Sequence, residues 1–318
     1  MATFKEIRGQ TIKKYTTNPT NPLAGQMWYN NTTGTLKVYT MGAAAWASGG
    51  DLGTARYSFA GSGTQTATLA AGGNAPSATA VVEEYNGTSW TGVTAIPSAT
   101  QNIRGFGTQT ASVAAGTIGG TTTYEYDGTN WGSGGAMNTG RGIGACNGIL
   151  TAGLYAGGYT GANSTASESY NGTAWTTTNS INTARRGSQS AGTLTAAVLM
   201  DGLNNAGYPS SKDVEEFNGT SWSTVTSTTS NRYGGLGGGA LQTAAFIAGG
   251  TNDITTLNLT EHYDGTNWSN SANIATARLN GMGAGTQSAG IIMGGIGPNA
   301  QTEEFNAAAL EVQTVTTS

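Results

Sequence analysis

The sequence has few charged, cysteine or histidine residues. Charged side chains make up 9% of the 318 residues, against about 25% in a typical globular protein. Cys146 is the only cysteine and His262 the only histidine. A single cysteine excludes an intrachain disulfide, and so few Cys and His ligands argue against a zinc site. We expect Cys146 to act as a small buried hydrophobe.

Long apolar runs and helical periodicity are also missing. No stretch of 18 apolar residues occurs, so we expect no transmembrane helix and no membrane insertion. The first residues lack the apolar segment of a secretory signal. Apolar residues at helical spacing are absent, which predicts little or no helix. Low charge with 51 glycines could indicate disorder, but the periodic placement of aromatic residues argues against it.

Tryptophan recurs along the chain at intervals of 41 to 47 residues. The six repeat positions are Trp46, Trp90, Trp131, Trp175, Trp222 and Trp268. Five of them end the same motif, which contains an aromatic residue, Asn-Gly-Thr or Asp-Gly-Thr, one further residue and the Trp, as in Tyr85 to Trp90. A fixed period of this length indicates a repeat array, in which one unit cannot bury its apolar face alone.

Each repeat has further landmarks in a constant order. An arginine follows the Trp, and the six arginines are Arg56, Arg104, Arg141, Arg185, Arg232 and Arg278. Arg104 follows fourteen residues after its Trp, whereas the other five follow ten residues after theirs. A Gly-Thr-Gln-Thr-Ala type stretch, a small apolar run ending in Gly-Gly and a Glu-containing strand complete the unit. The fourth unit has Met200-Asp201-Gly202 in place of the Gly-Gly.

This content predicts about four short strands per repeat, which is one propeller blade. The Asn/Asp-Gly pairs predict hairpins, because both turn residues can adopt positive φ. We expect the Trp and Tyr rings to pack between adjacent blades. Pairing of early and late strands would close the ring and remove free sheet edges.

The Gly-Gly, Glu-x-Tyr, Trp and Arg landmarks resemble those of kelch β-propellers over roughly residues 47–310. The resemblance implies an all-β, kelch-like propeller of six blades, in which the Glu and Arg residues link neighbouring blades. The last unit departs from the pattern, with Ala at the turn Gly and Leu310 at the Trp position. Seven blades is the alternative, if Leu36 to Thr40 completes a further unit.

The N-terminal region does not follow the repeat. Residues 25–39 predict a hairpin around an Asn-Thr-Thr-Gly turn, preceded by an extended Pro-containing arm. We therefore divide the chain into an arm and hairpin, residues 1–46, and a propeller, residues 47–318. The Gly-x-x-Trp-Tyr-Asn hairpin resembles those of tail and fibre proteins of tailed bacteriophages. The Asn-Gly-Thr-Ser-Trp repeats resemble those of marine phage virion proteins.

Charge is divided unevenly along the chain. Residues 1–46 carry five basic residues and one acidic residue, a net charge of +4, and the remainder carries eight and sixteen, a net charge of −8. A propeller without a basic stripe is not expected to bind nucleic acid. The basic arm is either a contact to an acidic partner surface or a solubilising tail.

Catalytic constellations are not evident. His262 occupies a repeat position that holds Glu in most units, so we interpret it as a surface or interblade residue. The glutamates recur in every repeat, which favours structural pairing with the arginines over a glycosidase pair. We expect no enzyme activity, no cofactor and no metal.

The least repetitive loops are the candidate ligand-binding segments, because recognition often lies on loops held by a rigid scaffold. Simple loop variation is the alternative explanation. The candidate residues are Tyr159, Asn163, Asn204, Asn205, Tyr208, Lys212, Asn252 and Asp253.

Together these features lead us to expect a non-enzymatic phage virion protein of the tail or tail-fibre apparatus, assembled in the host cytoplasm. Its partners would be other virion proteins, contacted through the N-terminal arm, with several copies on each particle. Host surface glycan is the candidate ligand of its loops. The alternatives are a capsid or neck decoration protein with a structural role and, from another class, a glycan-active enzyme.

Overall fold

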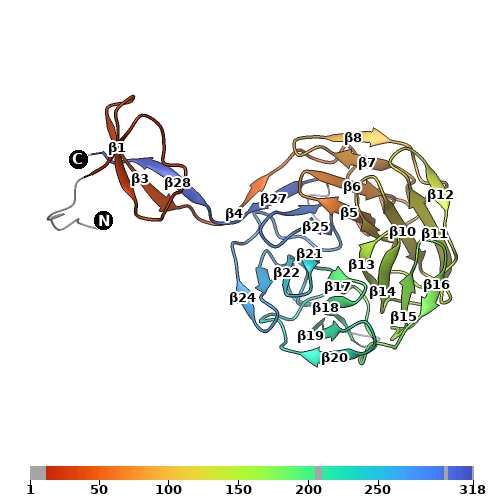
Figure 1. The fold of residues 1–318 in the computed structure, drawn as a ribbon. Helices are drawn as coiled ribbons and strands as arrows, with labels where there is room; N and C mark the ends of the chain where they lie inside the picture. The colour runs from red at the N-terminus through yellow and green to blue at the C-terminus, as the bar shows by residue number, and fades with distance from the viewer. Residues whose placement is uncertain (1–11, 205–209, 297–299, 317–318) are drawn as a thin grey trace. The chain divides into compact units, whose positions relative to one another are not determined.

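The computed structural model describes residues 12–204, 210–296 and 300–316, and every regular element in these ranges is a β-strand (Figure 1). The chain divides into two compact units: unit 1, Met1–Ala45 with Ala307–Ser318, and unit 2, Trp46–Asn306. Seven four-stranded sheets are present, one in unit 1 and six in unit 2. The all-β, propeller-like expectation is confirmed. None of the described segments forms a helix that could span a bilayer.

The six sheets of unit 2 are antiparallel and are numbered here along the chain. Sheet 1 contains β5 (Ala60–Thr64), β6 (Ala67–Ala71), β7 (Val82–Tyr85) and β8 (Trp90–Val93). Sheet 2 contains β9 (Arg104–Gly107), β10 (Ser112–Thr117), β11 (Gly120–Tyr126) and β12 (Trp131–Ser133). Sheet 3 contains β13 (Ala145–Ile149), β14 (Ala152–Ala156), β15 (Ser167–Tyr170) and β16 (Trp175–Thr177).

The second half of unit 2 repeats this plan. Sheet 4 contains β17 (Gln189–Thr193), β18 (Ala196–Leu203), β19 (Ser210–Phe217) and β20 (Trp222–Val225). Sheet 5 contains β21 (Leu236–Leu241), β22 (Ala244–Ala248), β23 (Thr260–Tyr263) and β24 (Trp268–Asn270). Sheet 6 contains β25 (Met282–Gly285), β26 (Gly290–Met293), β27 (Thr302–Asn306) and β4 (Ala45–Ser48).

The six sheets form a closed ring with their first strands innermost (Figure 1). Each of these inner strands contacts the inner strand of the next sheet, and β25 contacts β5. The expected closure by early and late strands is present, because β4 joins β27 as the outer strand of sheet 6. Trp46 in β4 packs against Phe305, with the ring centroids 5.2 Å apart and the planes inclined at 56°, and so supplies the Trp that the last repeat lacks. The residues just before sheet 1 thus complete sheet 6, and the two ends of the ring are held together by strand pairing.

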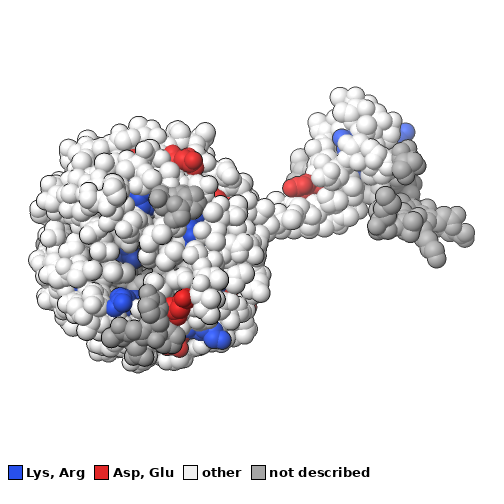
Figure 2. All heavy atoms as spheres, turned by 180° about the vertical axis from the view of Figure 1, so that it is seen from behind, with Lys and Arg blue, Asp and Glu red and all other residues white. Residues whose placement is uncertain are grey.

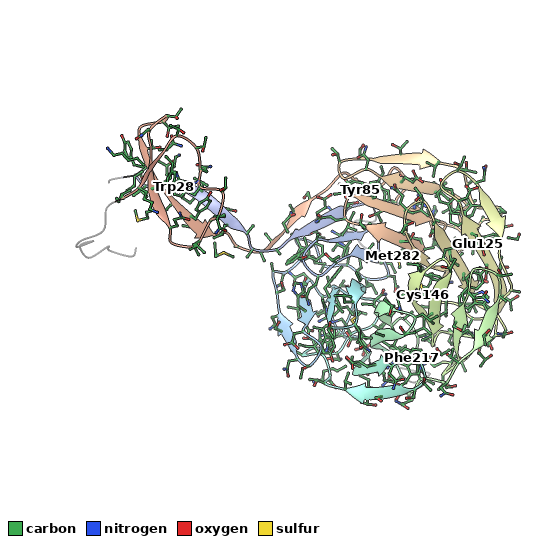
Figure 3. The ribbon with its side chains drawn as sticks, viewed as in Figure 1. Trp28, Tyr85, Glu125, Cys146, Phe217 and Met282 are labelled. Carbon is green, nitrogen blue, oxygen red and sulfur yellow. The ribbon has the colours of Figure 1, made fainter. Side chains whose placement is uncertain are left out.

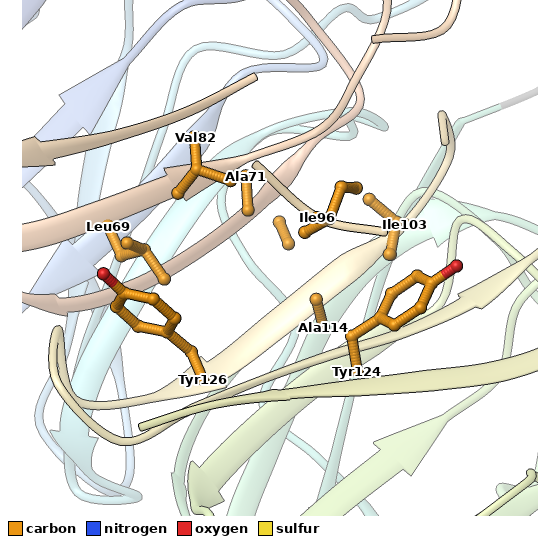
Figure 4. Packing of buried hydrophobic residues seen from close by; sticks show 9 residues of the cluster. Leu69, Ala71, Val82, Ile96, Ile103, Ala114, Tyr124 and Tyr126 are labelled. Atoms are coloured by element: carbon orange, nitrogen blue, oxygen red, sulfur yellow. The ribbon is translucent and has the colours of Figure 1, made fainter. Parts of the chain in front are cut away.

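Apolar side chains fill the space between neighbouring sheets. The cluster between sheets 1 and 2 includes Leu69, Val82, Ala114 and Tyr126 (Figure 4). Similar clusters lie at the other five sheet contacts. Fully burying one Leu, Val or Phe side chain stabilises a fold by about 1.5–3 kcal/mol. Because every sheet buries both faces against its neighbours, the ring forms one continuous core.

Aromatic residues pack as the repeat predicted. The Tyr and Trp at the two ends of each turn are cross-strand partners, as at Tyr85 and Trp90, whose rings lie 5.0 Å apart. The indole N–H then reaches the preceding sheet: Trp90 Nε1 donates to Thr302 Oγ1 at 3.0 Å. One detail of the turn differs from expectation. Only the Gly, such as Gly87, has positive φ, while the side-chain oxygen of Asn86 accepts two backbone N–H groups.

Unit 1 contains one sheet in the order β1 (Lys14–Tyr15), β2 (Met27–Asn30), β3 (Thr35–Met41) and β28 (Leu310–Thr314). The expected hairpin is β2 and β3, and Trp28 of β2 stacks on Tyr39 of β3 at 4.6 Å. β28 pairs antiparallel with β3. The predicted boundary was therefore wrong at the C-terminal side. Residues 307–318 belong to unit 1, because β28 covers the edge of β3 that would otherwise be unpaired.

Candidate binding site

Five of the six repeat arginines are buried and paired with a glutamate. The pairs are Arg56–Glu83, Arg141–Glu168, Arg185–Glu215, Arg232–Glu261 and Arg278–Glu303. In each pair, the Arg precedes the inner strand and the Glu lies in the third strand of the same sheet. The resemblance implied a link between neighbouring blades, and this was wrong for the ion pair itself. The Glu instead binds the segment that connects the preceding sheet to its own sheet. Glu83, for example, accepts the N–H groups of Gly53 and Thr54.

Arg104 does not belong to this series, which corrects the sequence assignment. In four of the other five units, the carbonyl of the repeat Arg accepts an N–H from the second residue of the Gly-Gly or Asp-Gly pair in the preceding sheet, as Arg185 accepts from Gly158. In sheet 2 the equivalent acceptor is Thr100, which accepts from Gly73. Arg104 lies four residues later, buried in β9, and donates to Gly144 O at 3.0 Å. Sheet 2 thus lacks the ion pair.

A second set of glutamates connects neighbouring sheets. Glu84 accepts the hydroxyl of Tyr126 at 2.9 Å, and Glu125 accepts that of Tyr170. Glu216 and Glu304 accept Tyr263 and Tyr85 in the same way. Figure 3 labels Tyr85, Glu125 and Phe217 toward the outer part of the ring. We call these Glu–Tyr hydrogen bonds between neighbouring sheets the tyrosine ladder. The sequence analysis did not predict the ladder, although the spacing of the Glu and Tyr residues was visible in the sequence.

The ladder explains the only histidine. Where the repeat Glu is absent, the next sheet has Phe instead of Tyr: Ser169 faces sheet 4 with Phe217, and His262 packs edge-on against Phe305 at 5.0 Å. Burial lowers the pKa of His262. A neutral imidazole against a phenyl ring is a packing arrangement, and it places His262 between sheets as expected.

The fourth repeat replaces a glycine with a buried acid. Asp201 adopts a φ of 56° at this position, and its carboxylate lies 3.2 Å from Arg232, which also pairs with Glu261. Thr228 donates to the same carboxylate at 2.6 Å. Burial raises the pKa of Asp201 to about 8, opposed by the nearby Arg232. One guanidinium shared by two carboxylates cannot fully compensate both charges.

The predicted loop residues are only partly brought together. Arg186 lies over the Tyr159 ring at 4.5 Å and donates to Asn163 at 3.1 Å. Asn204 donates to Asp213, Asn252 accepts N–H groups of its own turn, Asp253 accepts Ser210 N–H, and Lys212 is exposed. Asn205 and Tyr208 lie outside the described residues. Most of these polar groups therefore hold the loops together, so the structure does not gather them into one recognition surface.

A central cavity of about 450 Å³ lies on the axis of the ring, lined by the inner strands of all six sheets. Figure 3 labels two lining residues, Cys146 and Met282, close to this axis. The lining extends to the turns between first and second strands, including Thr64, Leu194 and Thr286. The predicted loops follow the second strands. Because first and second strands are antiparallel, these loops lie on the opposite face of unit 2.

The cavity wall combines small, apolar and uncharged polar residues. Asn147 and Ser190, from β13 and β17, are its buried polar residues without a full set of partners. Cys146 donates its thiol to Gly105 O at 3.1 Å, and burial raises its pKa to about 12, so a thiolate is disfavoured at neutral pH. Sequence reasoning missed Asn147. Its signal was a polar amide where the other inner strands carry Ser62, Phe106, Ala191, Gly238 and Ala284.

Charge is sparse on the face of unit 2 shown in Figure 2, where residues of both signs are scattered without a basic stripe. Among residues 12–204, 210–296 and 300–316, no three Asp, Glu, His or Cys residues gather as metal ligands. This arrangement offers hydrogen bonding and apolar contact, rather than ionic contact, to a ligand.

No protein-family model and no curated protein matches the chain. Among solved structures, "Structure of YjhT" is similar, with a TM-score of 0.66 and 13% sequence identity. The match covers 82% of this chain and 99% of that one. At this identity the likeness establishes a shared fold only, and function has to be argued from the site.

Proposed function

We propose that this protein is a non-enzymatic structural component of a tailed-phage virion, in the tail or tail-fibre apparatus, assembled in the host cytoplasm. Unit 2 is the displayed body, and we interpret its six sheets as the six blades of a kelch-like propeller. Unit 1 is the attachment element that contacts other virion proteins. Several copies on each particle would convert weak contacts with a host surface into avid attachment.

The observation that carries this proposal is the way in which the chain enters and leaves the ring. Residues before the ring, β3, pair with residues after it, β28, in one sheet of unit 1. Unit 2 is therefore inserted within unit 1 and is connected to it by two segments of chain. A body connected twice to its anchor is constrained more strongly than one on a single linker, which suits a displayed module.

The use of the repeating carboxylates supports binding over catalysis. Glu83 and its equivalents neutralise buried arginines, and Glu84 and its equivalents accept tyrosine hydroxyls. Catalytic carboxylate pairs require groups free to exchange protons with substrate. His262, against Phe305, is likewise engaged in packing.

Location on the particle is the direct test. An antibody raised against unit 2 would be applied to intact particles and imaged by electron microscopy. Label on the tail or fibres supports the proposal. Label over the shell or at the neck would favour the decoration role instead, and unlabelled particles would overturn both.

The attachment role of unit 1 has a separate test. A fragment of residues 46–306 keeps all six sheets of the ring, including β4 except for Ala45, but lacks unit 1. We expect it to fold, as judged by circular dichroism, and to be absent from assembled particles, whereas the full chain is incorporated. Equal incorporation of fragment and full chain would contradict the anchoring role.

A further inference from the structure

We propose that the central cavity of unit 2 binds an uncharged, hydroxyl-bearing small molecule with an apolar face, of the size of a terminal neutral sugar. The cavity differs from the loops that the sequence indicated and lies at the other face of the ring. If the ligand belongs to a host surface, this proposal rests on the proposed virion function. The binding of the small molecule itself depends only on the cavity.

Two residues of the cavity wall each carry an enclosed side-chain oxygen that has no hydrogen-bond partner in the described part of the chain. The two oxygens are Asn147 Oδ1 and Ser190 Oγ, on the adjacent strands β13 and β17. Asn147 is 7% exposed and Ser190 is 9% exposed. An unpaired buried polar group carries a desolvation cost that a ligand hydrogen bond would remove. The two atoms therefore mark a side of the cavity where a ligand would gain the most.

The roles of the two atoms are set by their surroundings. Asn147 Nδ2 already donates to Thr193 O at 3.1 Å, so its Oδ1 remains as an acceptor. Ser190 can donate or accept. In contrast, Ser62 on the other side of the cavity is already bonded to Ser112 at 2.8 Å. A ligand that donates to Asn147 and exchanges a hydrogen bond with Ser190 carries hydroxyl groups.

The remaining wall selects against charge and favours an apolar face. None of the residues lining the cavity is charged. A carboxylate or phosphate would lose its hydration there without gaining a counter-charge. Ile149 and Leu194, at the turns of sheets 3 and 4, line the same side as the two polar atoms. The corresponding turns of sheets 1, 2 and 6 carry Thr-Gln-Thr or Thr-Gln-Ser instead.

The cavity volume limits the ligand. About 450 Å³ lies in the lower part of the range of roughly 300–1,000 Å³ typical of small-molecule pockets. This space suits one sugar residue or the end of a glycan. Sugar rings present hydroxyl groups at their edges and C–H groups on their faces, which matches a wall with both kinds of surface.

The test uses the purified full chain and saturation-transfer NMR with a panel of methyl glycosides of neutral hexoses and N-acetylhexosamines. The anionic counterpart is the methyl glycoside of glucuronic acid, which has the ring of glucose. We expect saturable binding of at least one neutral glycoside in the millimolar range and much weaker binding of the glucuronide. No binding of any neutral glycoside, or equal binding of the glucuronide, would overturn the proposal.

Variants locate the binding within the ring. Ser190→Ala removes a single oxygen and should weaken binding by roughly three- to ten-fold, and Asn147→Ala should do at least as much. Ser167→Ala is the matched control, because Ser167 Oγ is also buried without a partner but lies in β15, away from the cavity. Equal effects of Ser190→Ala and Ser167→Ala would place the ligand elsewhere. Particle labelling tests the virion role independently, so either proposal can fail without the other.

Discussion

Removing both charges of a buried ion pair should destabilise unit 2 far less than the sum of the two single removals. Arg56 is fully buried, and besides Glu83 it donates to Val81 O at 2.6 Å, Gly72 O at 3.1 Å and Thr54 O at 3.3 Å. Glu83→Gln keeps one oxygen for the backbone N–H groups of residues 53 and 54, which the two carboxylate oxygens accept separately, and leaves the guanidinium without a counter-charge. Breaking a buried pair on one side costs about 3–5 kcal/mol, and we expect Glu83→Gln to lie near the lower limit.

The double variant separates charge compensation from hydrogen bonding. Arg56→Met alone leaves a buried carboxylate and three carbonyls without their Arg56 donors, which should cost about 3–5 kcal/mol. Arg56→Met with Glu83→Gln has no buried charge and loses mainly the three carbonyl bonds, each worth about 1 kcal/mol. We expect a loss of about 3 kcal/mol for the double variant instead of the sum of at least about 6, a coupling at the upper end of measured values. Sheet 2, with Thr100 and Tyr124 at these two positions, has lost both charges together.

Urea unfolding at neutral pH, followed by tryptophan fluorescence and by circular dichroism, measures these free energies, and coincident transitions would justify two-state treatment. Glu311→Gln, an exposed carboxylate of unit 1, serves as the control and should change stability by less than about 0.5 kcal/mol. Additive losses for Arg56→Met and Glu83→Gln would refute the argument that the two charges are retained for mutual compensation.

Three further predictions concern the acid in sheet 4, the tyrosine ladder and the ring closure. The pKa of Asp201 is raised above its unfolded value, so its stabilising contribution is complete below about pH 4 and is lost as pH rises toward about 8. Asp201→Asn should abolish that part of the pH dependence of the melting temperature. Identical pH profiles of the variant and the original protein would contradict this prediction. Burial and Glu125 raise the pKa of Tyr170 to about 12, so its contribution to the stability of the fold should persist to about pH 10 and fall above that pH. In an ultraviolet titration, Tyr170→Phe should lack one of the phenols that ionise late. Loss of a phenol that ionises near pH 10 would contradict this prediction. Trp46→Ala should lower the free energy of unfolding, measured in urea, by about 3 kcal/mol. Trp46 packs against Phe305 and donates a hydrogen bond to Thr260. An unchanged unfolding midpoint would show that ring closure does not depend on Trp46.

Much of the fold could be predicted because the repeat is a local signal. The Tyr-to-Trp phrases predicted the hairpins, since a short turn between aromatic residues determines the register of two adjacent strands. The resulting pairs, such as Tyr85 with Trp90, are present. The same alignment of repeats predicted that His262 is a surface or interblade residue, and the structure places it between two sheets. These features depend on residues close together in the chain.

Other features required the tertiary structure because they join distant residues. The sequence analysis placed Arg104 with the other arginines although it follows its Trp by fourteen residues instead of ten. Backbone hydrogen bonding assigns that position to Thr100. The pairing of β28 with β3 spans nearly the whole chain, and β28 carries no repeat signal of its own. The sequence therefore could not reveal that the last residues leave the ring.

The candidate site also has features that the sequence predicts and features that only the tertiary structure reveals. The sequence by itself determined a charge-poor, glycine-rich array of β-sheets, because composition and period are properties of the chain. Only the tertiary structure decided that Asn147 and Ser190, on the adjacent strands β13 and β17, line one cavity and that each has a side-chain oxygen without a partner. They stand 43 positions apart and belong to different repeats, and only closure of the ring turns six inner strands toward a common axis.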